Sequence, residues 1–354
     1  MFRPVAVFCT FVMSMTCPAL GQDNPREAAN QGTVGVIVEN IDDLSLRAAN
    51  ELAYVLNDEN QLRVLPTQSR GAEESIIDLL FLKGVEVGIV QTDVLDNAKE
   101  QLVFPGLERT LHYIAKLYSE EIHLIARRDV DNVWALSGRT VNIGPQGSGS
   151  ARTASIVLQK LDIDVNMANV GHHEALEKLE AGEIDGMIVV GSKPLPLLAD
   201  LRFDEGFHIV PLPYSDRLAE SYRRMTLSSD DYAGLIDPAG PIQTLAVENV
   251  MAVYNWRQDS AQYEKVSRFV EAFFDQLPAL KRPPNHVKWE EVDLAAEFPG
   301  WSRFAAADSW IDQNAESAGA GAANDDVVSG EAGASGDEPD AQLLKDQMLR
   351  KAPM

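Results

Sequence analysis

Three apolar, strand-like segments alternate with two helical segments early in this chain, and this alternation restricts the possible folds more than any other feature. The strand-like segments are Thr33–Val38, Leu62–Leu65 and Val85–Val90, and the helical ones are Leu44–Leu56 and Ile76–Leu82. In both helical segments the apolar residues recur at a spacing that places them on one face. A βαβαβ order favours a parallel sheet covered by helices. Such sheets bind ligands beyond the carboxyl ends of their strands, where we expect a crevice.

A second group of alternating elements follows. Its predicted strands are Ile122–Ala126, Thr140–Ile143, Met167–Val170 and Met187–Val190, and its predicted helices are Ala151–Leu161, Glu174–Ala181 and Leu195–Leu201. Later still, Gln243–Tyr254 is apolar and strand-like, and Tyr263–Leu277 is an amphipathic helix. If these last two elements dock on the first group, one domain is discontinuous.

The predicted fold class is therefore α/β with two lobes joined by hinge crossovers. Lobe I is expected to comprise residues 33–118 and 215–310, and lobe II residues 121–212. The chain would cross between the lobes near Leu117–Glu121 and Pro211–Ser215. The cleft between the lobes is then the place for a ligand.

A loop rich in glycine and serine separates the strand Thr140–Ile143 from the helix that follows it. Glycines let backbone N–H groups approach a guest closely, and Ser148 or Ser150 can cap the helix. The unpaired N–H groups of the first helical turn then form an anion site. The loop lacks both the Lys of a nucleotide-binding P-loop and the glycine spacing of a dinucleotide fingerprint, so a carboxylate is the anion that fits. The alternative is a capped turn that binds nothing.

The N-terminus resembles a targeting segment. Arg3 precedes the mostly apolar run Pro4–Met15, and the small residues around Ala19–Gly21 suit a signal peptidase. We therefore predict that residues 1–21 are a signal peptide and that the chain is exported to the periplasm.

Cysteine content and charge exclude several kinds of function. The two cysteines, Cys9 and Cys17, both lie in the predicted signal peptide, so the exported chain would have no disulfide, catalytic thiol or cysteine metal site. The formal net charge of −24 would repel nucleic acid and anionic membrane surfaces. We expect neither as a partner.

The composition changes near Asn314 to Ala, Gly, Ser, Asp and Glu. Residues 314–354 are therefore predicted to be an acidic low-complexity tail. Residues 316–340 offer too little apolar surface to offset the entropy of ordering, so we expect disorder there.

Several short motifs occur in an order that resembles a known family. They are Leu65–Gly71, the small-residue strand that ends in Gln91-Thr92-Asp93, the loop Gly144–Ala154, Ala181–Gly186, Gly191–Pro194, Asp231–Gly234 and Gln243–Val247. Together they resemble the TAXI-type solute receptors of TRAP transporters, which have the type II periplasmic binding protein fold. The resemblance covers about Thr33–Trp310. It implies a monomeric, non-enzymatic receptor without a cofactor, which binds a small carboxylate or amino acid and delivers it to a TRAP-type membrane permease.

The candidate ligand-binding residues follow from these motifs. They are Thr67, Ser69, Gln91, Asp93, Gly147, Ser148, Gly149, Ser150, Arg152 and Gly191. Thr67 and Ser69 either meet the ligand or cap the next helix, and Asp93 either meets it or caps a helix that begins at Val94. Arg152 either clamps a carboxylate or points into solvent.

One segment departs from the family pattern. The first strand is usually followed by a glycine-rich loop with an aromatic pair, but here Glu39–Ser45 contains the carboxylates of Glu39, Asp42 and Asp43. If this loop lines the cleft, it repels an anion and suits an ammonium group. A zwitterionic amino acid would then meet both this loop and the glycine-rich one.

Other chemistry has little support in the sequence. The adjacent His172 and His173 face different directions on a helix, so we expect no metal site. No nucleophile elbow or catalytic triad is evident, so we do not expect an enzyme. The leading hypothesis is an exported solute receptor, and the alternative is an exported interaction or sensory-accessory protein that kept the receptor fold without a transported ligand.

Overall fold

The computed structural model describes residues 30–39, 44–58, 62–101, 104–199, 201 and 206–325. Side chains are described as far as residue 315. The chain up to Asp308 forms one compact unit, and a second unit begins at Ser309. The predicted signal peptide, Asp42, Asp43 and the tail beyond residue 325 lie outside the described residues.

The elements alternate as the sequence predicts. The strands are β1 (Thr33–Val38), β2 (Arg63–Gln68), β3 (Val87–Gln91), β4 (Leu111–Arg127), β5 (Thr140–Asn142), β6 (Asn166–Ala168), β7 (Gly186–Gly191), β8 (Phe207–Ile209), β9 (Arg223–Leu227) and β10 (Ile242–Tyr254). The α-helices are α2 (Leu44–Leu56), α3 (Ala72–Phe81), α4 (Thr92–Glu100), α5 (Leu107–Thr110), α6 (Gly149–Lys160), α7 (His172–Glu180), α8 (Asp216–Ala219), α9 (Ala261–Leu280) and α10 (Ala305–Asp325). Short 3-10 turns are η1 (Val133–Leu136), η2 (Pro196–Leu198) and η3 (Val287–Glu291).

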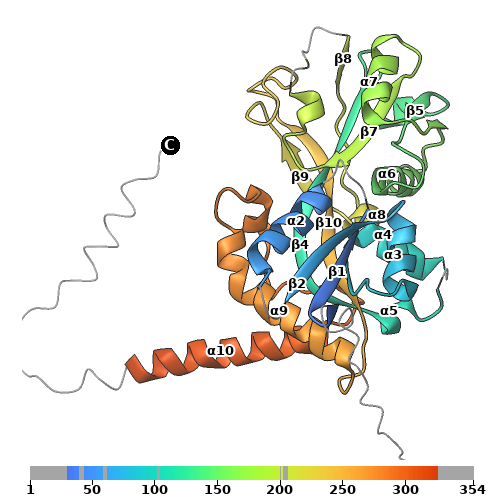
Figure 1. The fold of residues 1–354 in the computed structure, drawn as a ribbon. Helices are drawn as coiled ribbons and strands as arrows, with labels where there is room; N and C mark the ends of the chain where they lie inside the picture. The colour runs from blue at the N-terminus through green and yellow to red at the C-terminus, as the bar shows by residue number, and fades with distance from the viewer. Residues whose placement is uncertain are drawn as a thin grey trace, which may run out of the picture. The chain divides into compact units, whose positions relative to one another are not determined.

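All the described strands belong to one curled sheet with the order β2-β1-β3-β10-β4-β7-β5-β6 (Figure 1). β1 pairs in parallel with β2 and β3, as the βαβαβ pattern predicts. β5 pairs in parallel with β6 and β7. The antiparallel strand β10 lies between β3 and β4, and β8 and β9 pair with β4 and β10 off this path.

Two long strands connect the two parallel parts of the sheet. The first part of β4 pairs with β10, and from Glu121 onward it pairs with β7 and then β8. β10 begins against β9 and ends against β3. Both strands are buried along most of their length, as expected for strands covered on both faces.

The side chains form separate cores on the two parts of the sheet. One core contains Ile37, Ile76, Val94, Val250 and Trp301. Two others contain residues from Ile122 to Leu212, and they also contain Leu218, Tyr222, Leu235, Leu245 and Val247. This packing differs from the predicted placement of all residues 215–310 in lobe I, because β10 is one continuous strand that contributes to cores on both parts. The exact lobe boundaries stay a prediction.

Two segments differ from their predicted structure. Among the described residues of Leu195–Leu201, helical structure is limited to the short turn η2, with a proline as its first residue. α10 continues to Asp325, so residues 316–325 are helical where disorder was expected. Alanine, which recurs through this segment, has the highest helix propensity of all residues.

Candidate functional site: the cleft at the start of α6

The glycine-rich loop forms the helix start that the sequence predicts. Gly144 and Gly147 have left-handed backbone angles, with φ of 100° and 81°. Ser148 is the N-cap of α6, and its Oγ accepts a hydrogen bond from the N–H of Ala151 at 3.1 Å. Ser150 turns to β7 instead, where its Oγ lies 3.3 Å from both the N and the O of Val190. Ser148 is therefore the cap.

A carboxylate occupies the N-terminus of α6, and the chain itself supplies it. The carboxylate of Glu39, the residue after β1, accepts a hydrogen bond from the backbone N–H of Gly149. The unpaired N–H groups and positive dipole end of a helix favour a negative charge here. The acidic residue and the glycine-rich loop, predicted to meet the two ends of a zwitterion, are paired with each other.

Other buried carboxyl groups surround Glu39. Burial raises the pKa of Glu39 to about 7, although the bond from Gly149 lowers it, and the nearby Glu120 and Asp93 raise it further. Gln91 connects this group to β4, because its Nε2 lies 3.2 Å from Oε2 of Glu120. The predicted ligand residue Gln91 thus contacts the chain's own acids.

Asp93 lies at the start of α4 and joins three segments. Its Oδ2 accepts hydrogen bonds from Thr153 of α6 at 2.7 Å and from Tyr222 at 2.8 Å. Burial raises the pKa of Asp93 to about 6, against the effect of these two hydrogen bonds and one from the backbone of Val94. Asp93 therefore links α4 to α6 across the cleft.

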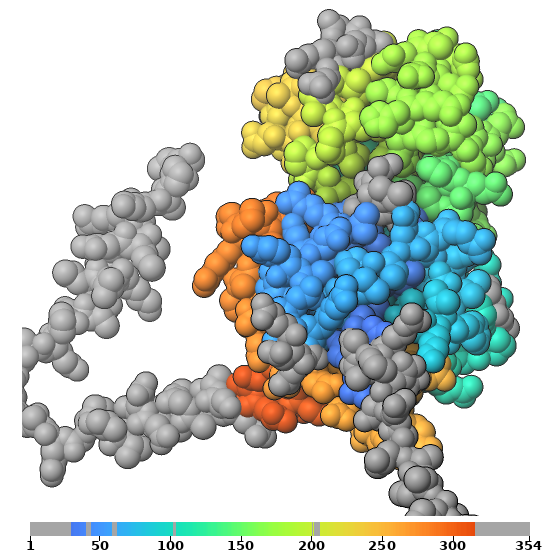
Figure 2. Space-filling model, viewed as in Figure 1, coloured from blue at the N-terminus to red at the C-terminus, as the bar shows by residue number. Residues whose placement is uncertain are grey.

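A cavity of ≈ 510 Å³ opens beside Glu39 and the start of α6. Four of the predicted ligand residues line it: Gln91, Ser148, Ser150 and Gly191. Its other walls include Leu44, Arg47, Pro145, Gly171, His172, His173, Val189, Val190, Ser192, Pro194, Leu195, Pro196, Leu197 and His286. The cavity thus combines apolar surface with imidazole, guanidinium and hydroxyl groups. In Figure 2, the blue N-terminal elements and the green elements around α6 and α7 adjoin one another.

Direct contacts join the loop after β2 to the loop before α6. The N–H of Ala72 donates to the carbonyl oxygen of Gly147 at 3.0 Å. Arg152 of α6 forms an ion pair with Glu73 of α3, so it neither lines the cavity nor points into free solvent. The glycine-rich loop therefore lies against the loop that contains the predicted Thr67–Ser69 site.

Thr67 and Ser69 themselves do not line the cavity. The Oγ1 of Thr67 donates to the carbonyl oxygen of Val36 at 3.3 Å, within the β1–β2 pair. Ser69 is buried next to the end of β1, and its Oγ has no hydrogen-bond partner among the described residues.

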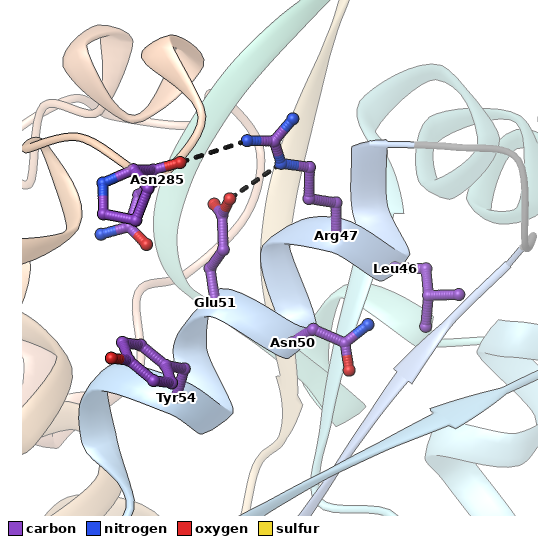
Figure 3. A pocket seen from close by; sticks show the side chains of 7 residues that line it. Leu46, Arg47, Asn50, Glu51, Tyr54 and Asn285 are labelled. Carbon is purple, nitrogen blue, oxygen red and sulfur yellow. Dashed lines mark hydrogen bonds and ion pairs between the residues drawn. The ribbon is translucent and has the colours of Figure 1, made fainter.

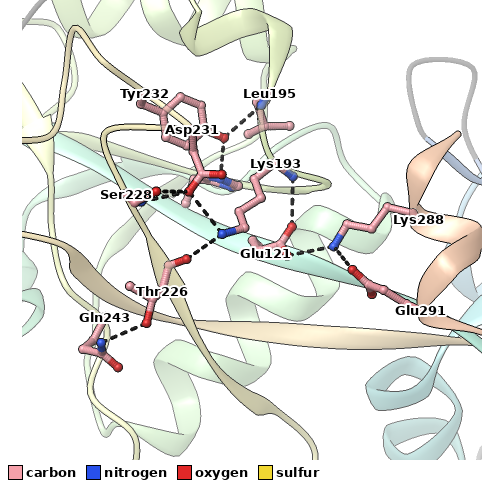
Figure 4. A network of polar contacts seen from close by, with 11 residues as sticks. Glu121, Lys193, Leu195, Thr226, Ser228, Asp231, Tyr232, Gln243, Lys288 and Glu291 are labelled. Carbon is pink, nitrogen blue, oxygen red and sulfur yellow. Dashed lines mark hydrogen bonds and ion pairs between the residues drawn. The ribbon is translucent and has the colours of Figure 1, made fainter. Parts of the chain in front are cut away.

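A second polar network lies where β4 passes between the two parts of the sheet (Figure 4). The carboxylate of Glu121 accepts hydrogen bonds from Lys288 Nζ at 2.8 Å and from the backbone N–H of Lys193 at 2.9 Å. Lys193 Nζ reaches Asp231 at 3.1 Å. Burial raises the pKa of Glu121, and the Lys288 ammonium opposes this effect. Glu121 thus connects the cavity wall after β7 to η3.

The family comparison matches residues 48–298 to one family model, described as the NMT1-like family. The chain belongs to the NMT1-like family. Several solved structures are similar to this chain. One is a mutant of ArgBP from T. maritima, which is 13% identical; the match covers 72% of this chain and 94% of that chain, with a TM-score of 0.42. The periplasmic binding protein BugD matches with 12% identity, coverage of 73% and 85%, and a TM-score of 0.44. A TctC solute binding protein from Polaromonas matches with 14% identity, coverage of 70% and 88%, and a TM-score of 0.39.

The sheet of this NMT1-like chain confirms the predicted fold class. A parallel βαβαβ unit, an antiparallel strand inserted beside it and a second α/β part reached through β4 form the one sheet, as the predicted α/β class requires. In the part of the chain that the structure describes, no helix is long and apolar enough to cross a membrane. No group of three or more His, Cys, Asp or Glu residues among the described ones is arranged to hold a metal ion.

Two further pockets lie outside this cleft. One, of ≈ 520 Å³, is lined by α2 and the segment before η3, where Arg47 contacts Glu51 and the carbonyl oxygen of Pro284 (Figure 3). The other, of ≈ 540 Å³, lies near Trp134 and Tyr214. Neither contains a predicted ligand residue.

Several residues of the cleft carry no signal in the sequence that points to the site. Tyr222 and Asn249 bind the buried acids Asp93 and Glu120 from distant segments, and His286 reaches the cavity from the segment before η3. None of them belongs to a motif, so only the packing of the sheet brings them to the site.

Proposed function

We propose that this chain is an exported receptor that captures a small carboxylate or amino acid in the cleft at the start of α6. One observation supports this most strongly: the N-terminus of α6 accepts a carboxylate in the structure, that of Glu39. Helix starts of this kind bind anions through their free N–H groups. In the receptor, the N–H group of Gly149 and its neighbours at the start of α6 would hold the carboxylate of the solute.

The cavity beside this anion site supports a small organic solute. Its volume of ≈ 510 Å³ falls within the range of small-molecule sites. Val189, Leu195 and Leu197 offer an apolar wall, while Gln91 and Ser192 offer polar groups. In this proposal, the polar groups orient the solute and the apolar wall excludes water from it.

We propose that binding couples to closure of two lobes, one on each side of the cleft. β4 and β10 are the connections, and they would act as hinges near Glu121 and near Ala246. The contacts of Ala72 with Gly147 and of Arg152 with Glu73 belong to the closed arrangement. A membrane partner that recognises this closed surface would receive the solute.

The finer identity rests on the sequence motifs. We propose the TAXI type among TRAP-transporter receptors, with a signal peptide in residues 1–21, a periplasmic location, a TRAP-type permease as the partner and no enzymatic step. The alternative is an exported interaction protein without a transported ligand. The position of Glu39 favours this alternative, because the chain's own carboxylate fills the anion site.

A thermal-shift screen of small monocarboxylates, dicarboxylates and amino acids tests the receptor proposal. At 100 Kd, a ligand that binds only the folded chain stabilises it by about 2.7 kcal/mol, which shifts the midpoint by several degrees. The shift should disappear in Gln91→Ala and persist in Gln101→Ala, which removes an exposed glutamine outside the cavity. If no acid shifts the midpoint, the interaction-protein alternative is favoured.

A further inference from the structure

Glu39 and Gly149 come from opposite sides of the cleft. Glu39 follows β1, and Gly149 begins α6, which lies 110 residues later in the chain. The contact therefore forms only when the two sides lie together. It places a half-buried carboxylate where the helix presents its first unpaired N–H groups.

We propose that Glu39 is an internal ligand of the cleft, whose carboxylate holds the start of α6 until the carboxylate of a solute displaces it. The inference rests on the proposed function, because it takes the solute to carry a carboxylate. One N–H group of Gly149 cannot serve both acids, so the two groups compete for the same position.

The space around Gly149 supports this competition. A Cβ atom placed on Gly149 would collide with Oε2 of Glu39 and Oε1 of Gln91, so these two side chains already fill the volume above the helix start. Glu120 and Asp93 also act on Glu39 as like charges. A second carboxylate would add both a steric clash and further repulsion.

The competition makes Glu39 a residue that sets how strongly a solute must bind in order to open the site, while the apolar wall selects among acids. When only a fraction of the molecules has the site open, the apparent affinity for every acid falls by that fraction. A solute overcomes this penalty by burying an apolar body against Val189, Leu195 and Leu197. The cleft should therefore prefer monocarboxylates with an apolar body to the smallest acids, such as acetate.

The first arm of the test measures the internal contact without any ligand. In the ¹⁵N-labelled full chain, the amide of Gly149 should exchange with solvent at least tenfold faster in Glu39→Ala than in the unchanged protein. Glu180→Ala, which removes an exposed carboxylate at the end of α7, is the matched control and should change nothing. Equal exchange of Gly149 in the unchanged protein and in Glu39→Ala would overturn the proposal.

The second arm measures displacement by calorimetric titration with acetate and with 4-methylpentanoate, a monocarboxylate with a branched apolar chain. Glu39→Ala should bind 4-methylpentanoate at least tenfold more tightly than the unchanged protein, and acetate should bind more weakly than 4-methylpentanoate to both. Equal or weaker binding by Glu39→Ala would overturn the proposal. If exchange of Gly149 depends on Glu39 but neither protein binds any carboxylate, the proposed function fails together with the displacement step, and only the internal contact stands.

Discussion

Lys288 Nζ lies 2.8 Å from Oε1 of Glu121, and both side chains are almost completely buried. Glu121 is the residue at which β4 changes partners from β10 to β7. Lys288 comes from η3 and also contacts Glu291 at 2.7 Å. Because the other oxygen of Glu121 holds the backbone of Lys193, this one carboxylate connects η3, β4 and the wall of the cleft.

Replacement of Lys288 by Met should strongly destabilise the fold. The substitution keeps most of the volume and removes the charge, so Glu121 is left buried without its partner. Breaking a buried pair in this way costs on the order of 3–5 kcal/mol. Chemical denaturation of Lys288→Met and of the unchanged chain measures the difference.

Lys178→Met is the matched control for that prediction. Lys178 contacts Glu183 at 3.1 Å, but this pair is exposed to solvent. Its removal should leave the denaturation midpoint almost unchanged. A similar loss of stability in both variants would mean that the effect of Lys288→Met does not come from the burial of the Glu121–Lys288 pair.

The N-cap of α6 allows a second prediction. Ser148→Ala removes the oxygen that accepts from the N–H of Ala151 and should cost about 1 kcal/mol. Ser155→Ala is the control, because the hydroxyl of Ser155 donates to the carbonyl oxygen of Ala151 within the helix and makes a long contact with Met167 Sδ at 4.0 Å, and it caps no N–H group. Thermal unfolding should show a lower midpoint for Ser148→Ala than for Ser155→Ala, and the reverse order would contradict the capping role.

The helix start at Gly147–Ser150 was predictable because its information is local. Glycines, a serine cap and an apolar helical run follow one another within a few residues, and the structure has the expected turn and cap. The parallel pairing of β1 with β2 and β3 was predictable for the same reason, since a βαβαβ sequence allows few topologies.

The partners of the site residues were not predictable, because they depend on side chains brought together from distant segments. Glu39 was recognised as an acid near the cleft, but not as the group that fills the anion site. Arg152 was expected either to bind the ligand or to point into solvent. It forms an ion pair with Glu73 of α3 instead. The core to which Leu245 and Val247 belong was not predictable either. β10 contributes side chains to two cores, and its apolar pattern shows no break between them.

The raised pKa values of Glu39 and Asp93 predict that the stability contributed by these two groups falls as the pH rises. Burial raises the pKa of Glu39 from 4.5 to about 7 and that of Asp93 from 3.8 to about 6. A group with a raised pKa contributes stability that is complete below its unfolded value and is lost as the pH rises through its folded value. Between pH 5 and 8 the loss from these two groups should be on the order of 2 kcal/mol, after allowance for the partial exposure of Glu39. Burial lowers the pKa of His123 to about 4, so His123 changes stability in the opposite direction over the same range.

Thermal unfolding across that pH range measures this dependence. The double variant Glu39→Gln and Asp93→Asn should gain stability relative to the unchanged chain as the pH rises, because neither amide titrates and His123 affects both chains alike. Glu180→Gln, which changes an exposed carboxyl group, should keep the full dependence. A stability difference between the double variant and the unchanged chain that stays constant or changes in the opposite sense between pH 5 and 8 would contradict the assigned direction.

Gly71 gives the last prediction, since it lies where the loop after β2 meets the loop before α6. A Cβ atom on Gly71 would lie 2.5 Å from the carbonyl oxygen of Gly147, closer than side-chain atoms normally approach backbone. Gly71→Ala should therefore separate the two loops and weaken the hydrogen bond from Ala72 to Gly147, at a cost of about 1–3 kcal/mol.

Gly240→Ala is the control for this steric effect, because the nearest atom to its added Cβ is 3.9 Å away. Hydrogen exchange of the amide of Ala72 measures the contact directly and should become faster in Gly71→Ala alone. A Gly71→Ala chain with unchanged exchange and an unchanged unfolding midpoint would show that the two loops are not held together as the structure has them. Because we propose that this contact belongs to the closed cleft beside Glu39, Gly71→Ala should also speed the exchange of Gly149.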